Sequence, residues 1–317
     1  MKGHNVKISD KPFELEKLDK KTEVLGIFVD SKVDKKVFAA LPKLKLIVTF
    51  STGFDHVNLK EAKKRKIPVC NVPTYGENTV AQHAMALLLT ISKKIFTSTK
   101  RVKEGIYDYH GLRGFDLKDK TVGIVGTGHI GVYMIKMLSG FDVNITAFDV
   151  FPNKELEKKY GFKYVSLNKL LQESDVISLH VPLLPTTKHM INKKNIKKMK
   201  KGVVIINTAR GGLVDPEALV WGLESGQVAG AGMDVMEEEG ILHNPEILLT
   251  GKLPAIDIKE GLMEQIIIDH ENTIITPHSA FNTTEAIKRI IDTNVDNIQK
   301  FTAGETQNDV TKPKKKH

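Results

Sequence analysis

Polar residues follow several predicted strands of this chain at the point where each strand ends. These residues are, in chain order, His180, the stretch Asn207 to Gly211, Asp234 and His278. A single histidine or aspartate in such a place is more often a helix cap or a turn residue. However, parallel strands bring their carboxyl ends to one edge of a sheet, where ligands bind. Four successive strands that each deliver a polar group to this edge predict a site there.

Glycines with the spacing G-x-G-x-x-G follow the apolar strand Val122–Val125 and precede a helical stretch, Val132–Leu138. Gly126 allows a tight turn, Gly128 lets the backbone approach a pyrophosphate, and Gly131 lets the helix pack close to its strand. The helix N-terminus adds amide donors and the positive end of the helix dipole. Glycines in an ordinary turn are the alternative, but the strand–turn–helix context favours a dinucleotide site.

Asp149 ends the next predicted strand, Asn144–Phe148. A carboxylate at this place can bind both hydroxyls of an adenine ribose and would repel a 2′-phosphate. No arginine stands beside it, since Val150 and Phe151 follow. The sequence therefore predicts NAD rather than NADP.

The elements that must position these residues are short β-branched runs alternating with amphipathic stretches. Predicted strands are Val24–Val29, Leu46–Phe50, Val122–Val125, Asn144–Phe148, Val176–His180, Val203–Asn207, Ala231–Val235 and Thr273–Ile275. Helical patterns between them include Leu167–Glu173, Lys193–Met199 and Pro216–Ser225. This alternation is typical of βαβ units, so we expect an α/β fold with doubly wound parallel sheets. A length of 317 residues indicates two domains.

Charge and cysteine content narrow the class of protein. The net charge is +9, but the lysines are spread over the whole chain, with one dense cluster in the tail Lys312 to Lys316. This distribution favours solvated surface lysines over a nucleic-acid footprint. The single cysteine, Cys70, cannot form an intramolecular disulfide, and no metal-ligand spacing is present. No signal-peptide pattern or membrane-spanning run occurs, so we expect a cytosolic protein without a metal.

Together these motifs resemble the NAD-dependent D-2-hydroxyacid dehydrogenases, from Leu46 to about Ala286. The motifs that carry the resemblance are the glycine loop, Ser51-Thr52-Gly53-Phe54-Asp55-His56, Asn71-Val72-Pro73-Thr74-Tyr75, Thr79-Val80-Ala81-Gln82-His83, Asn207-Thr208-Ala209-Arg210-Gly211, Met233-Asp234-Val235 and Thr276-Pro277-His278-Ser279-Ala280. The resemblance implies reduction of a 2-keto acid by NADH.

Residue roles follow from this resemblance. Arg210 would anchor the substrate, His278 would protonate the carbonyl oxygen, and Glu239 would hold and polarise that histidine. Asp234 would orient the nicotinamide carboxamide. The remaining cofactor-binding residues would be Gly126, Gly128, His129, Ile130, Gly131, Asp149, His180, Val181, Pro182, Thr208 and Ala209. The backbone amides of Thr52 and Gly53 would cradle the substrate carboxylate.

The sequence determines the side chain of the substrate less closely than it determines the reaction. The segment Leu242 to Asn272 has a length that resembles the D-lactate branch of the family, and Tyr75 and Phe281 match aromatic pocket positions of that branch. An apolar wall suits a methyl or alkyl group, so pyruvate or a branched keto acid is expected. The alternatives are a glycerate- or phosphoglycerate-type dehydrogenase, and an NAD-sensing binding protein similar to the carboxyl-terminal binding protein corepressors.

The resemblance also implies the domain organisation. Residues 76–281 would form a Rossmann-type NAD-binding domain, inserted in a smaller flavodoxin-like substrate domain made of residues 1–75 and 282–317. The active site would lie in the cleft between them. Asn5–Ser9 and Gly26–Val29 match the second and third strands of the family's small domain, so its first strand–helix unit is expected to be absent. The helix that opens near Thr79 implies a homodimer.

Overall fold

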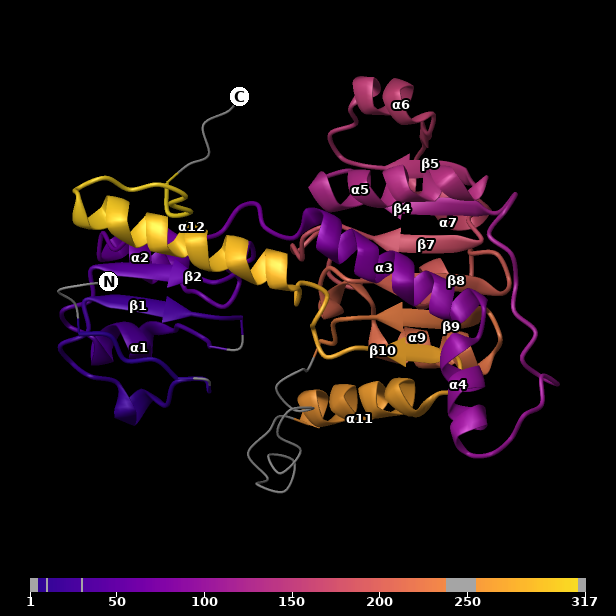
Figure 1. The fold of residues 1–317 in the computed structure, drawn as a ribbon, viewed down its shortest axis with the longest axis horizontal. Helices are drawn as coiled ribbons and strands as arrows, with labels where there is room; N and C mark the ends of the chain where they lie inside the picture. Colours follow the sequence, from indigo (N-terminus) through magenta and orange to yellow (C-terminus); the bar gives the residue numbers. More distant parts are fainter. Residues whose placement is uncertain (1–4, 10, 30, 238–254, 313–317) are drawn as a thin grey trace. The chain divides into compact units, whose positions relative to one another are not determined.

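Two compact units make up the chain, of which the computed structural model describes residues 5–9, 11–29, 31–237 and 255–312. Unit 1 comprises Met1–Gly76 with Asn282–His317, and unit 2 comprises Glu77–Phe281. Each unit combines helices with a parallel sheet (Figure 1). The α/β class expected from the sequence is confirmed.

Unit 1 contains a three-stranded parallel sheet in the order β1-β2-β3. Its strands are β1 (Val24–Ile27), β2 (Leu46–Thr49) and β3 (Val69–Cys70). Its helices are α1 (Lys35–Ala40), α2 (Leu59–Lys64), α12 (Thr284–Thr302) and a 3-10 turn at Leu15–Lys17. The stretch Asn5–Ser9, which was expected to match a strand, forms none.

Helix α12 closes unit 1 although it comes from the far end of the sequence. Ile298 and Phe301 pack against the apolar side chains of β2. Two fully buried asparagines add specific contacts: Asn294 Nδ2 donates to the carbonyl of Thr49 at 3.1 Å, and Asn297 Nδ2 donates to that of Asn71 at 3.1 Å. The C-terminal helix therefore satisfies backbone carbonyls at the ends of strands formed by the first 76 residues.

Unit 2 contains a seven-stranded parallel sheet in the order β10-β9-β8-β7-β4-β5-β6. The strands are β4 (Thr121–Val125), β5 (Asn144–Phe148), β6 (Lys163–Tyr164), β7 (Val176–Leu179), β8 (Val203–Asn207), β9 (Val228–Met233) and β10 (Thr273–Ile275). The central strands β7 and β8 are buried at every residue. This burial explains their unbroken apolar runs, because helices cover both faces of a parallel sheet.

The helices of unit 2 form a layer on each face of this sheet. One hydrophobic cluster includes side chains of α3 and α5, and a second includes side chains of α7, α8, α9 and α11. The helices are α3 (Glu77–Ser92), α4 (Ile95–Lys103), α5 (His129–Leu138), α6 (Lys154–Tyr160), α7 (Leu167–Glu173), α8 (Lys193–Ile196), α9 (Pro216–Glu224) and α11 (Ala255–Asp269), with 3-10 turns at Ser139–Phe141 and Gly211–Leu213. Local sequence signals set where α9 begins, because Asp215 caps its N-terminus and Pro216 occupies its first turn.

The strand order reverses at β4, since β5 and β6 lie on one side of it and β7 to β10 on the other. At such a switch point the chain leaves neighbouring strands in opposite directions, which opens a crevice outside their carboxyl ends. The crevice of unit 2 is therefore expected between the ends of β4 and β7. The glycine loop and His180 follow these two strands.

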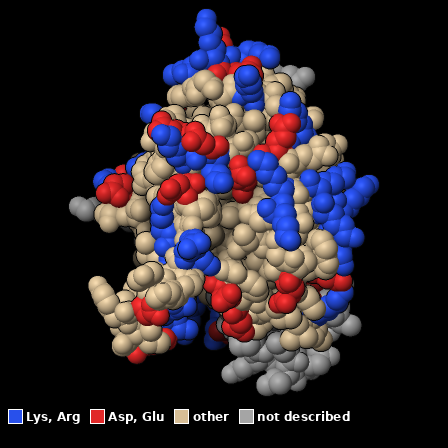
Figure 2. Space-filling model, turned by 90° about the vertical axis from the view of Figure 1, so that its right-hand side faces the viewer, with Lys and Arg blue, Asp and Glu red and all other residues tan. Residues whose placement is uncertain are grey.

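The surface of the chain is mixed in charge. Figure 2 shows Lys and Arg side chains interspersed with Asp and Glu on the face that it draws. Among the described residues, no helix is long and apolar enough to cross a bilayer.

Candidate active site

The glycine loop between β4 and α5 is tight at two glycines and open at the third. Gly126 has φ +96°, and a Cβ there would lie 2.6 Å from the carbonyl oxygen of His180. A Cβ on Gly131 would lie 2.0 Å from the Gly126 oxygen, whereas one on Gly128 would meet nothing within 4 Å. His129 and Ile130 open the first turn of α5. The loop is therefore closed against β7 and leaves space at the helix N-terminus, where an anion is favoured.

Asp149, at the end of β5, is held in place by the glycine loop itself. Its Oδ2 accepts hydrogen bonds from the Thr127 backbone amide at 2.7 Å and from Thr127 Oγ1 at 3.0 Å, and its Oδ1 accepts from the Phe151 amide at 2.9 Å. The Tyr164 hydroxyl lies 2.8 Å from Thr127 Oγ1. A carboxylate has about four acceptor positions, so Asp149 keeps capacity for a further donor such as a ribose hydroxyl.

Two polar atoms at the ends of β7 and β8 are buried without a hydrogen-bond partner among the described residues: His180 Nδ1 and Thr208 Oγ1. The other ring nitrogen of His180, Nε2, lies 2.8 Å from Ser178 Oγ. Burial lowers the pKa of His180 to about 4, so its imidazole is neutral at physiological pH. Buried polar atoms are normally satisfied, which makes these two candidates for contact with a ligand. Val181 and Pro182 continue the chain from His180, and Ala209 follows Thr208.

Arg210 follows β8 on a loop that is packed from two sides. Asn207 Nδ2 donates to the Arg210 carbonyl at 2.9 Å, and Arg210 Nη1 donates to the Ala209 carbonyl at 2.7 Å. A Cβ on Gly211 would lie 2.0 Å from the backbone of Met236. The guanidinium is thus carried by a short loop whose backbone has little freedom.

Asp234, directly after β9, holds the turn that carries His278. Its side chain is 1% exposed, and its Oδ1 accepts from Thr276 Oγ1 at 2.5 Å and from the Ser279 amide at 2.9 Å. Its Oδ2 accepts from the Ala280 amide at 2.8 Å. One acceptor position therefore remains on Oδ2, which suits the amide of a carboxamide. Sequence reasoning assigned Asp234 to the cofactor alone and did not foresee its bonds to the turn.

The backbone of His278 lies in the left-handed region, with φ +51°. A residue other than glycine in this region costs on the order of 1 kcal/mol and persists only where neighbouring contacts hold it. The three hydrogen bonds from the turn to Asp234 supply such contacts. The imidazole is therefore presented from a fixed, strained turn.

The predicted substrate residues of unit 1 lie in a braced turn after β2. Thr52 Oγ1 donates to the Val72 carbonyl at 2.7 Å, and Asn71 Nδ2 donates to the Thr52 carbonyl at 2.7 Å. Among the described residues, the backbone amides of Thr52 and Gly53 donate no hydrogen bond. Such a pair of amides suits a carboxylate. Tyr75 is half-buried in unit 1, its carbonyl bound by Arg289 Nε.

Two further residues predicted for the site are Glu239 and Phe281. Glu239 lies outside the described residues. Phe281 is half-buried at the end of unit 2.

Several contacts of this region were not predicted from the sequence. Glu237 accepts from His189 Nε2 at 2.6 Å and pairs with Lys188 at 3.0 Å. The His189 amide donates to the Gly212 carbonyl at 2.8 Å, which braces the Arg210 loop. His83 Nε2, on α3, lies 2.9 Å from Thr276 Oγ1. The stretch Thr79 to His83 was noted only as part of a motif, and its contact with Thr276 spans 193 positions.

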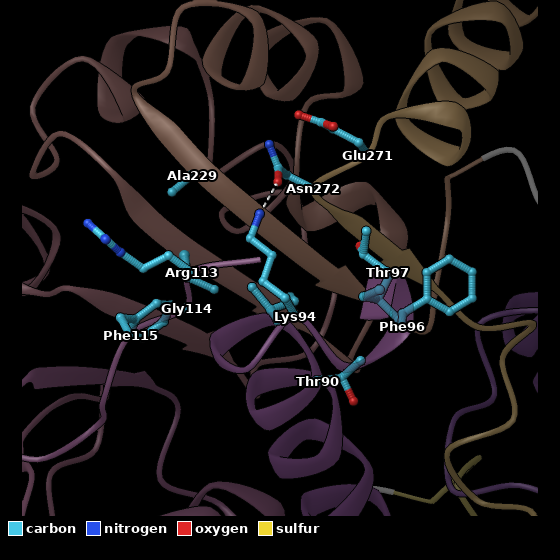
Figure 3. Close-up of a pocket in the computed structure, with 13 residues that line it drawn as sticks. Thr90, Lys94, Phe96, Thr97, Arg113, Gly114, Phe115, Ala229, Glu271 and Asn272 are labelled. Atoms are coloured by element: carbon cyan, nitrogen blue, oxygen red, sulfur yellow. Dashed lines mark hydrogen bonds between the residues drawn. The ribbon is translucent and has the colours of Figure 1, made fainter. Parts of the chain in front are cut away.

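A pocket of about 260 Å³ lies at the other end of the strands of the seven-stranded sheet, near their amino ends (Figure 3). It is lined by Val204 and Ala229, near the beginnings of β8 and β9, and by Lys94, whose Nζ donates to Asn272 Oδ1 at 2.8 Å. None of the predicted site residues lines it. Among the described residues, no group of three or more His, Cys, Asp or Glu side chains could hold a metal ion.

A sequence profile described as the NAD-binding domain of D-isomer specific 2-hydroxyacid dehydrogenases matches residues 85–280. The chain belongs to this family. The match covers the glycine loop, Arg210, Asp234 and His278, so the resemblance stated from the sequence is confirmed.

Relatives of this dehydrogenase match over most of its length. A protein of Schizosaccharomyces pombe named 2-hydroxyacid dehydrogenase homolog 1 is 41% identical over 90% of this chain and 86% of its own. Glyoxylate reductase of Korarchaeum cryptofilum is 35% identical over 90% of this chain and 81% of its own. The crystal structure of D-lactate dehydrogenase from Aquifex aeolicus with NAD and lactic acid has a TM-score of 0.85 at 36% identity, covering 94% of this chain and 90% of that one.

The cofactor of this NAD-dependent dehydrogenase is NAD, as expected from the sequence. The residues present fit it: a Cβ on Gly128 would meet nothing within 4 Å, which leaves the backbone there open to a pyrophosphate, and Asp149 retains acceptor capacity for ribose hydroxyls. His180 Nδ1 and Thr208 Oγ1 are buried polar atoms that a bound group could satisfy.

Proposed function

We propose that this dehydrogenase reduces a small 2-keto acid with an apolar side chain, pyruvate first, to the D-2-hydroxy acid with NADH. One observation carries the proposal: Arg210, Asp234 and His278 follow three neighbouring strands, β8, β9 and β10, and Asp234 ties the His278 turn to β9. Strands lie about 4.8 Å apart, so three strand ends span about 10 Å. This width suits a small keto acid beside a nicotinamide.

In the proposed reaction the guanidinium of Arg210 binds the carboxylate and the carbonyl oxygen of the keto acid in a planar fork. When bound, NADH would supply the hydride that adds to the carbonyl carbon. The carbonyl oxygen gains the electron pair of the broken π bond and takes a proton from the imidazolium of His278. Arg210 lowers the barrier further because its positive charge faces the developing alkoxide. The product is a 2-hydroxy acid, and His278 regains its proton from solvent.

Glu239 is proposed to keep His278 protonated and oriented, and Glu239→Gln tests this role. The variant should lower turnover and shift the acidic limb of the pH–rate profile, because the glutamine that replaces the carboxylate cannot take up a proton at low pH. NADH affinity, measured by fluorescence titration, should stay unchanged. A profile identical to that of the unmodified enzyme would remove Glu239 from the mechanism.

The cofactor-binding roles are proposed for the loop and strand ends already described. The first turn of α5, from Gly128 through Gly131, would bind the pyrophosphate, and Asp149 would bind the adenine ribose. The remaining contacts are assigned to Gly126, His180, Val181, Pro182, Thr208, Ala209 and Asp234. Support comes from the open space at Gly128 and from the unpartnered atoms of His180 and Thr208.

Unit 1 is proposed as the substrate domain and unit 2 as the NAD-binding domain. The amides of Thr52 and Gly53 would bind the substrate carboxylate, which is supported by their unused donor capacity among the described residues. Tyr75 and Phe281 would line the space for the substrate side chain. Aromatic walls favour a methyl or alkyl group over a hydroxyl or phosphate.

The test is loss of NADH absorbance with a panel of 2-keto acids: pyruvate, 4-methyl-2-oxopentanoate, phenylpyruvate, glyoxylate and hydroxypyruvate. The highest kcat/KM should fall on pyruvate or the branched acid, and NADPH should replace NADH poorly because Asp149 repels the 2′-phosphate. Tight NADH binding with no turnover on any acid would contradict the proposal.

Glyoxylate is the second candidate substrate, because one relative is named glyoxylate reductase at 35% identity. Glyoxylate lacks the methyl group of pyruvate and so gains nothing from an apolar wall. One methyl group in an apolar pocket is worth about 1–3 kcal/mol, or roughly 10–200-fold. A kcat/KM for glyoxylate equal to or above that for pyruvate would favour this alternative.

A homodimer is proposed, with α4 and the segment after it in the interface. Large apolar side chains are exposed there, namely Ile95, Phe96, Val102, Ile106, Tyr107 and Tyr109, the two tyrosines at 94% and 78%. Contiguous exposed apolar residues of this kind mark association surfaces. Light scattering after gel filtration should give twice the chain mass of 35.3 kDa, and Tyr107→Ser with Tyr109→Ser should shift it toward the monomer.

A cytosolic location is proposed as well. Support comes from the single cysteine, Cys70, which is buried and whose thiol pKa burial raises to about 12, so that it stays a thiol. Cell fractionation with an antibody against the chain would test it.

A further inference from the structure

His83 of α3 lies at the end of a hydrogen-bonded chain that leads to the His278 turn. Its Nε2 is 2.9 Å from Thr276 Oγ1 and 3.4 Å from Asp234 Oδ1. Thr276 Oγ1 in turn lies 2.5 Å from the same Asp234 oxygen. The roles assigned so far to Arg210, Asp234 and His278 make no use of His83.

The protons in this chain can be placed by counting donors. An ionised carboxylate only accepts, so the single hydroxyl proton of Thr276 points to Asp234. Thr276 Oγ1 must then accept from the imidazole, which places a proton on His83 Nε2. The chain therefore runs in one direction, from His83 through Thr276 to Asp234. Each link fixes the orientation of the next.

We propose that His83 is a positioning residue for the reduction, which fixes the Thr276 hydroxyl and through Asp234 the turn that presents His278. The inference rests on the proposed role of His278 as proton donor. Without the imidazole donor, the Thr276 hydroxyl is free to rotate away, and Asp234 Oδ1 loses one of its two donors from the turn. The left-handed backbone of His278 is then held less firmly.

The surroundings of His83 argue against a simple packing role. Its side chain is 24% exposed, whereas the core contacts of α3 are made by neighbours such as Ala84, Leu87 and Leu88. An apolar residue at this place would lose little packing. What distinguishes the imidazole here is a directed N–H donor.

Three variants test the proposal. His83→Leu removes the donor, His83→Gln keeps an amide N–H at a similar reach, and Gln82→Leu makes a matched polar-to-apolar change at an exposed position of the same helix. His83→Leu should lower kcat for the best keto acid about tenfold, with the NADH dissociation constant and the melting temperature nearly unchanged. His83→Gln should recover most of the lost turnover, and Gln82→Leu should behave as the unmodified enzyme.

A double-mutant cycle with Thr276→Val checks that both residues act through one chain. Thr276→Val should also lower kcat, and His83→Leu added to it should lower kcat no further, because the link is already broken. Independent, multiplying losses would overturn the proposal. So would an unchanged kcat in His83→Leu, or equal losses in the Leu and Gln variants.

Hydrogen exchange of the segment 276–280 separates failure of this inference from failure of the proposed function. His83→Leu should speed exchange of the Ser279 and Ala280 amides, which donate to Asp234, and His83→Gln should not. This readout needs no turnover. If the unmodified enzyme reduces no keto acid, the proposed function fails while the exchange result still decides the role of His83; unchanged exchange in His83→Leu overturns it.

Discussion

In the seven-stranded sheet of unit 2, the carboxyl ends of the strands lie on one side, called here the carboxyl edge, and their amino ends lie on the other, the amino edge. The two edges differ in the contacts that their polar groups make. At the carboxyl edge, Asp149 and Asp234 each accept three hydrogen bonds from named donors, and His278 sits in a strained turn. At the amino edge lies a pocket in which Lys94 bonds to Asn272 (Figure 3). The residues proposed for the active site therefore lie away from this pocket, among constrained carboxylates and the buried His180 and Thr208 atoms that have no partner among the described residues.

Among substitutions at the two edges, replacement of His278 should lower kcat the most. His278→Ala removes the proposed proton donor, so kcat should fall by about 10²–10⁴-fold while NADH still binds. Stopped-flow measurement of keto-acid reduction gives the rate, and fluorescence titration gives NADH affinity. Substantial residual turnover would remove His278 from the chemistry.

A change of Arg210, the proposed substrate anchor, should have the next largest effect. Arg210→Lys keeps the positive charge but loses the planar fork, so KM for the keto acid should rise and kcat should fall, together roughly 10²-fold in kcat/KM. Steady-state kinetics over a range of keto-acid concentrations measures both constants. An unchanged KM would count against anchoring by this residue.

The glycine loop allows a paired test within a few positions. Gly128→Ala places a methyl group in open space, so the fold should be intact, but NADH affinity should drop about tenfold because the methyl group would occupy the proposed place of the pyrophosphate. Gly126→Ala, in contrast, should lower the melting temperature, because its φ is +96° and its Cβ would meet the His180 carbonyl. Thermal unfolding and NADH titration on both variants distinguish the two roles; equal behaviour would contradict them.

His180 should make the free energy of unfolding depend on pH. Its folded pKa is about 4 against an ordinary value of 6.5, so between these values the unfolded chain binds a proton that the folded chain does not. Above about pH 6.5 this residue therefore does not lower the free energy of unfolding. As the pH drops toward 4, the free energy of unfolding falls by at most about 1.4 kcal/mol per pH unit. Urea unfolding at pH 6.5 and 5 should show a smaller drop for His180→Gln. The same drop in both proteins would argue against a buried neutral imidazole.

The smallest effect is expected at the amino edge. Lys94→Met breaks the bond to Asn272 in the pocket, and kcat/KM should stay within about twofold of the unmodified value because the change lies at the other end of the strands. The keto-acid assay measures this directly. A large loss of activity would mean that the two edges are coupled.

The sequence predicted most strands of the two sheets well. All eight predicted strands form, because each is an apolar run bounded by turn signals, and α7 begins and ends at the predicted residues Leu167 and Glu173. The strands β3 and β6 were missed because two residues are too few to show a period. Asn5–Ser9 was wrongly matched to a strand.

The supporting contacts of the site could not be predicted in the same way. Thr127 lies inside the glycine motif, but its bonds to Asp149 depend on the register of β4 against β5. Contacts such as His83 to Thr276 and Glu237 to His189 join segments far apart in the chain. The motifs identified the residues proposed to touch a ligand, whereas the residues that brace them are set by packing between distant segments.

The late position of α12 in the sequence has a consequence for synthesis. The sheet of unit 1 is complete after Cys70, but Asn294 and Asn297, which bond to the carbonyls of Thr49 and Asn71, leave the ribosome only after all of unit 2 has been made. At about 5–20 residues per second, this delay lasts on the order of 10–40 s. We therefore expect unit 2 to fold first during translation. Meanwhile the face of β2 that α12 covers stays open to chaperones.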